Sequence, residues 1–94
     1  MMHTITDMEN KAVTLKQKIK ELQAIVRRTN ELETLMKTHM YDLYIQEAHS
    51  MGNMVSVTLG KIEFLRRELH VTNKKIRLMK ELDSLYTDKE VVQE

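Results

Sequence analysis

The stretch from Met54 to Tyr86 constrains the fold more than any other part of the chain, because apolar residues recur there every seven positions on two lines. No proline interrupts it. With heptad positions named a to g, the first line holds Val55, Ile62, Leu69 and Ile76 at a, and Met51, Thr58, Leu65, Thr72, Met79 and Tyr86 at d. The second line, at c, is named the c stripe and holds Val57, Phe64, Val71, Leu78 and Leu85.

These two lines are too wide for a simple helix pair. With Leu82 at g and Leu59 at e, they cover roughly half of the helix circumference, more than the seam of a two-stranded coiled coil. The sequence therefore predicts a helix that lies between two neighbours in a bundle of three or four helices. The first half of the chain can supply one neighbour, and we expect the other to come from another molecule.

The first half of the chain carries a heptad register of its own. Its a positions are Ile5, Ala12, Ile19, Val26 and Met40, and its d positions are Met8, Leu15, Leu22, Met36 and Leu43. Thr29 at d and Glu33 at a interrupt the line. Asn30 followed by Glu33 also resembles a helix start, but we favour one continuous helix with a polar layer.

The first register ends at Ala48–Asn53, where Gly52 and Asn53 are the interior residues best suited to a tight turn. The sequence thus predicts one all-α coiled-coil domain over 1–94, folded as an antiparallel helical hairpin. Its expected parts are a helix over about 4–50, a turn at about 51–53, a helix over about 54–86 and a frayed tail over 87–94. One near-continuous helical rod is the alternative, because a single glycine costs a helix only about 1 kcal/mol.

Composition limits the remaining fold and function classes. Aromatic residues make up 4% of the chain and charged residues 31%, which suits long helices and does not suit a sheet. There is no cysteine, the formal net charge is +1, and no apolar run is long enough for a signal peptide or a membrane span. We expect a cytoplasmic or nuclear protein that is not secreted.

No residue pattern points to catalysis or to a bound cofactor. Gly-rich phosphate loops, nucleophile elbows and paired metal-binding histidines are all missing from the sequence. We expect no enzymatic activity, no catalytic residue, no cofactor and no metal.

A basic stripe is the one distinctive charge pattern. It lies at positions e, f and b of the second helix and comprises Arg66, Arg67, Lys74, Arg77 and Lys80. Such a stripe could meet an anionic partner, such as a membrane surface. It has no aromatic residues interleaved for base stacking, which argues against nucleic acid. We favour an ordinary solvated helix face.

In its length and its heptad pattern the chain resembles the small helical subunits of tethering, organelle-biogenesis, kinetochore or synaptonemal assemblies. It departs from SNARE proteins because no Gln or Arg occupies a core layer between Met54 and Tyr86. The two apolar lines predict a non-enzymatic structural subunit that oligomerises, or joins other helical subunits, through bundling. The expected interface residues are Val55, Val57, Leu59, Ile62, Phe64, Leu65, Leu69, Val71, Ile76, Leu78, Met79, Leu82 and Leu85.

Two other functions fit the same pattern. One is a small chaperone or adaptor, of a secretion or vesicle-tethering type, that holds a client helix and gains order on binding it. The other is an adaptor that uses the basic stripe to bind membrane or nucleic acid.

Overall fold

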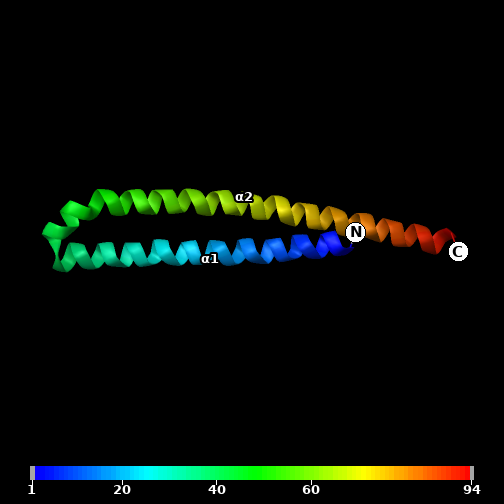
Figure 1. Cartoon of the computed structure of the whole chain (residues 1–94), viewed down its shortest axis with the longest axis horizontal. Helices are drawn as coiled ribbons and strands as arrows, with labels where there is room; N and C mark the ends of the chain where they lie inside the picture. Colours follow the sequence, from blue (N-terminus) through cyan, green and yellow to red (C-terminus); the bar gives the residue numbers. More distant parts are fainter. Residues whose placement is uncertain (1, 94) are drawn as a thin grey trace.

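The chain folds into two long helices that lie side by side in opposite directions (Figure 1). The computed structural model describes the backbone of residues 2–93 and the side chains of residues 5–86. Helix α1 spans Met2–His39 and helix α2 spans Tyr41–Gln93. The Cα trace measures 78 × 15 × 15 Å. At a rise of about 1.5 Å per residue, the 53 residues of α2 alone account for the long dimension. The all-α helical hairpin is confirmed.

The core is a single seam between the two helices. Its most buried apolar side chains, at 4–8% exposure, are Ile5, Ala12, Leu15, Ile19 and Ile62. All of them occupy a or d positions of the two heptad registers, so the apolar sides of the two helices face each other across the seam. Because each helix has only one neighbour, the flanks of this seam stay open to solvent.

Buried threonines form polar layers within the seam. Thr29, Thr58 and Thr72 are buried at d positions. The Thr29 hydroxyl donates to the Ile25 carbonyl at 2.9 Å, and the Thr58 hydroxyl donates to the Met54 carbonyl at 2.7 Å. Both hydroxyls thus bond to a carbonyl of their own helix. The Thr29 hydroxyl also lies 3.9 Å from the Met54 sulfur across the seam. Helix α1 continues through this region, so the continuous helix expected across Thr29–Glu33 is confirmed.

The turn expected at residues 51–53 is wrong. Helix α1 ends at His39, Met40 is the single residue between the helices, and α2 runs through Gly52 and Asn53. The backbone N–H of Met40 donates to the Met36 carbonyl at 2.8 Å, and that of Tyr44 donates to the Met40 carbonyl at 2.9 Å. The reversal thus keeps helix-type hydrogen bonds on both sides of Met40. No residue of the described chain has a positive φ.

The heptad registers explain why the chain reverses at Met40. The register of α2 extends backwards through Met51, Ala48 and Tyr44, which are all half-buried. Continuation of the first register would instead bury Met40 and Leu43, but they are 57% and 43% exposed. The two registers differ by one residue, and the reversal occurs where one replaces the other.

Gly52 does not break α2, because nothing about its position demands a turn. It lies at e on the exposed surface, with no atom near a Cβ added there. A glycine at an exposed helical site costs about 1 kcal/mol relative to alanine. A seam that continues on both sides of it outweighs that cost.

Helix α2 extends past the start of α1 (Figure 1). The Lys80 ammonium lies 3.7 Å from the Glu9 carboxylate, so residues of α2 beyond this pair approach the end of the seam. Leu82, Leu85 and Tyr86 are 45%, 65% and 66% exposed. The helix continues to Gln93, further than the expected end at residue 86, and the side chains of residues 87–94 lie outside the described part.

Candidate helix-docking face

The c stripe of α2 lies on the surface along its whole length. The exposures of Val57, Phe64, Val71, Leu78 and Leu85 are 59%, 59%, 49%, 54% and 65%. Residues seven apart on a helix lie nearly one above another, so the stripe is close to a straight apolar line. Monomeric proteins rarely leave a long contiguous apolar strip open to water, and such strips mark interaction surfaces.

The structure divides the expected interface residues into two groups. Those at a and d are buried or half-buried against α1 and form the hairpin's own seam, namely Val55, Ile62, Leu65, Leu69, Ile76 and Met79. The others are exposed, namely Val57, Leu59, Phe64, Val71, Leu78, Leu82 and Leu85. Only the second group is available to another molecule while the hairpin stays folded.

Helix α1 widens the apolar surface toward the turn. Its g positions run in a line through Lys11, Lys18, Ile25 and Leu32, and the first two border the c stripe. Ile25 and Leu32 are 46% and 45% exposed. Met54 at g of α2, 54% exposed, adds to the same side. The surface formed by the g positions of both helices and the c stripe is called the docking face below.

The first of two hollows in the docking face lies over a glycine. It has a volume of about 610 Å³ and is bordered on α2 by Val57, Gly60, Lys61 and Phe64. Lys18, Leu22 and Leu65 complete its lining. A Cβ added at Gly60 would have no atom within 4 Å. The absence of a side chain at Gly60 therefore deepens this hollow.

The second hollow follows one heptad further along α2. It has a volume of about 330 Å³ and is bordered by Phe64, Arg67, Glu68 and Val71. Lys11, Thr72 and Lys75 complete its lining. The two hollows therefore share Phe64 and repeat at the spacing of the c stripe.

Both hollows have the geometry of a coiled-coil hole. In knobs-into-holes packing, a side chain of one helix inserts between four residues of the facing helix at i, i+3, i+4 and i+7. Residues 57, 60, 61 and 64 have this spacing, and so do residues 64, 67, 68 and 71. The docking face thus has two successive surface hollows whose borders on α2 repeat this spacing.

Positive charge surrounds these holes. Lys18 and Lys61 border the first, and Lys11, Lys75 and Arg67 border the second, against the single carboxylate of Glu68. The Arg67 guanidinium also lies 2.9 Å from the Glu63 carboxylate, so the four lysines supply most of the positive charge.

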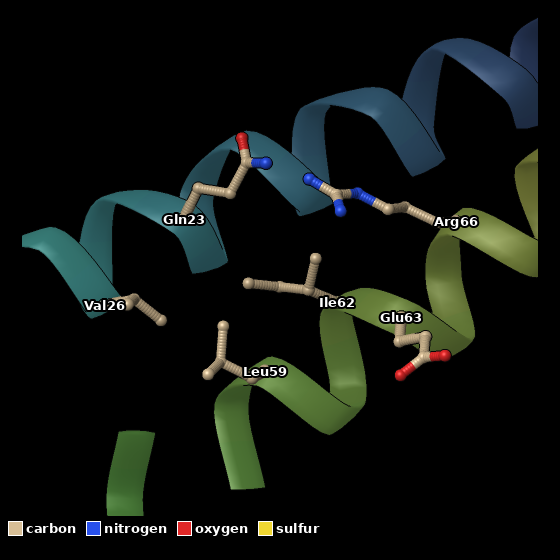
Figure 2. Close-up of a pocket in the computed structure, with 6 residues that line it drawn as sticks. All are labelled: Gln23, Val26, Leu59, Ile62, Glu63 and Arg66. Carbon is tan, nitrogen blue, oxygen red and sulfur yellow. The ribbon is translucent and has the colours of Figure 1, made fainter. Parts of the chain in front are cut away.

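A further hollow lies on the opposite side of the hairpin, where the apolar line is followed by polar residues. Figure 2 shows Leu59 and Ile62 directed toward α1, with Arg66 extending past them toward the α1 ribbon near Gln23. This groove has a volume of about 430 Å³. One heptad further along the e line, Leu59 is followed by Arg66 and then by Asn73 and Lys80. The apolar line therefore does not repeat here as it does on the docking face.

The basic stripe lies on the exposed surface of α2, and one of its members, Arg67, borders the second hollow of the docking face. Arg66, Arg67, Lys74, Arg77 and Lys80 are all exposed. Arg67 pairs with Glu63 and Lys80 pairs with Glu9 across the seam. These exposed ion pairs are the arrangement of a solvated helix face and contribute little to stability.

The described residues contain no group of three or more His, Asp or Glu side chains placed to hold a metal ion. Over the same residues, neither helix has a segment long and apolar enough to cross a bilayer. Comparison with protein-family models, with curated proteins and with solved structures finds no match to this chain.

Sequence reasoning did not identify two parts of the face. Gly60 was not recognised as the floor of a hole, although its place at f, between Val57 and Phe64, carries that signal. The lysines of α1 were not connected with the c stripe, because the position of the turn decides which α1 residues border it.

Proposed function

We propose that the chain is a non-enzymatic structural subunit that joins a larger helical assembly through its docking face. One observation carries the proposal: the c stripe is exposed from Val57 to Leu85 while the a and d residues are already covered by α1. The hairpin therefore buries one of the two apolar lines of α2 and leaves the other exposed, where a further helix can pack.

The free energy gained by burying the c stripe is of the same order as the cost of association. Full burial of a Val, Leu or Phe side chain contributes about 1.5–3 kcal/mol. The five c-stripe side chains are 49–65% exposed in the hairpin, so burial of the part still open to solvent contributes roughly 4–9 kcal/mol. Association costs about 4–15 kcal/mol in lost rigid-body freedom, before side-chain ordering. Burial of the c stripe therefore offsets much of this cost, and the affinity depends on how well the partner fits the two holes.

The test is sedimentation equilibrium of the isolated chain over a wide concentration range, at physiological and at high ionic strength. The proposal predicts that the average mass rises with concentration. High salt should strengthen the association, because the Debye length falls from about 8 Å to about 3 Å at 1 M and the lysines no longer repel one another.

Paired variants connect the association with the docking face. Phe64→Glu/Val71→Glu places carboxylates on the c stripe and should abolish the rise in mass. His70→Glu/Ser84→Glu adds carboxylates at exposed b positions of the same helix and should leave it unchanged. A wild-type chain that stays monomeric at every concentration and salt, and that also binds no added helical peptide, would contradict the proposal.

A further inference from the structure

We infer that the docking face accepts a helix from another protein, with apolar side chains at heptad spacing and acidic residues on both flanks. This inference rests on the proposed function, because it specifies which partner covers the c stripe.

The holes favour a helix over a flat surface. They lie one heptad apart and have the four-residue borders into which the side chains of a facing helix insert. A lipid bilayer has no repeating side chains, so its binding would make no use of this spacing. The partner is therefore a helix whose apolar residues recur every seven positions.

The charge favours acidic flanks. Lys11, Lys18, Lys61 and Lys75 border the holes, and Glu68 is the one carboxylate among the lining residues. Carboxylates beside the inserted side chains would lie close to these lysines, as e and g charges do in coiled coils that select their partners.

A second copy of this chain fits less well. It would bring the same lysines against the first copy, and like charges across a helix interface are destabilising. Self-association through the c stripe is then a weak, salt-promoted reaction, and an acid-flanked helix displaces it.

The two holes also differ in what they accept. Gly60 gives the first hole a low floor and a volume of about 610 Å³, against about 330 Å³ for the second. The partner's larger side chain therefore enters over Gly60, and a side chain added at this position fills the hole. Gly52 offers a matched control, since it is also exposed in α2 with open space around it.

The experiment measures binding of synthetic helical peptides to the full chain by calorimetry. One peptide of four heptads has Leu and Ile at its core positions and Glu on both flanks; its twin has Lys in place of Glu. The acidic peptide should bind at least about tenfold more tightly than the basic one, and its affinity should fall as salt is raised.

Two sets of variants locate the site. Gly60→Leu should weaken acidic-peptide binding by at least about tenfold, while Gly52→Leu should leave it nearly unchanged. Circular dichroism checks that both remain helical, as expected because leucine favours a helix over glycine. Lys18→Glu/Lys61→Glu leaves three cations against three carboxylates around the holes, so it should remove most of the preference for the acidic peptide.

The outcomes separate this inference from the proposed function. Equal binding of the two peptides overturns it, as does acidic-peptide binding that is insensitive to Gly60→Leu. Stronger binding to vesicles of phosphatidylserine than to the acidic peptide overturns it in favour of a membrane. If neither peptide binds but the chain self-associates through the c stripe, the inference fails and the proposed function stands. A monomer that binds neither peptide contradicts both.

Discussion

Ile62 and Phe64 are two residues apart on α2, and the structure assigns them opposite roles. Ile62 is 4% exposed in the seam, whereas Phe64 is 59% exposed on the docking face. Ile62→Ala should therefore destabilise the hairpin by about 2–3 kcal/mol, the lower part of the range for buried aliphatic truncations, because the seam is open on both flanks. Phe64→Ala removes more atoms but should change hairpin stability by no more than about 0.5 kcal/mol.

Urea unfolding followed by circular dichroism, at the lowest measurable concentration, checks this contrast. If Ile62→Ala leaves too little folded protein, Ile62→Val gives the same comparison at about 0.5–1.5 kcal/mol. In sedimentation experiments the order should be reversed, with Phe64→Ala weakening association and Ile62→Val leaving it nearly intact. Equal destabilisation of the dilute hairpin by both alanine variants would refute the assignment of the two faces.

Three further predictions concern the turn and the surface. Tyr41→Pro should lower the stability of the hairpin by no more than about 1 kcal/mol, because Tyr41 is the first residue of α2, where proline is accepted. Asn53→Pro lies in the helix interior and should lower stability by about 3 kcal/mol or more. Thermal unfolding checks this order, and the reverse order would indicate a turn at residues 51–53. Gly52→Ala should raise stability by up to about 1 kcal/mol, and a loss measured in urea would contradict a helical Gly52. Lys80→Ala should lower the free energy of unfolding by less than about 1 kcal/mol, since the ion pair between Lys80 and Glu9 is long and exposed. If this loss of stability does not become smaller in high salt, the pair is not a simple surface contact.

The heptad pattern of α2 predicted most of the architecture. The sequence predicted two apolar lines on this helix and a neighbour within the chain for one of them. The structure shows that α1 covers the a and d residues. The same pattern predicted a second apolar line that α1 does not cover, and the exposed c stripe has this property.

The turn was misplaced because glycine was given more weight than register. Gly52 and Asn53 are common at helix ends, but both are also compatible with an exposed helix interior. The stronger signal was the continuation of the α2 register through Met51, Ala48 and Tyr44, which leaves no gap at Gly52. A reversal built from helical residues around Met40 has no glycine or proline to indicate it.

The docking face could be predicted only in part for the same reason. Residues of one helix that share a face follow from spacing, so the c stripe was accessible from sequence. Which residues of α1 stand beside it depends on where the chain reverses. Moving the turn from Gly52 to Met40 changes the α1 neighbours of Phe64, and only with the reversal at Met40 do Lys11 and Lys18 border the holes.

The most direct test of the central claim uses the lack of cysteine in the chain. A single cysteine at Val71 reports on the c stripe, and one at His70 reports on the exposed b position beside it. The alkylation rate of each is measured for the dilute chain and again at high concentration or with the acid-flanked peptide. We predict similar rates in the dilute chain and strong protection of position 71 alone on association. Equal protection of both positions, or protection of position 70 alone, would contradict the docking face.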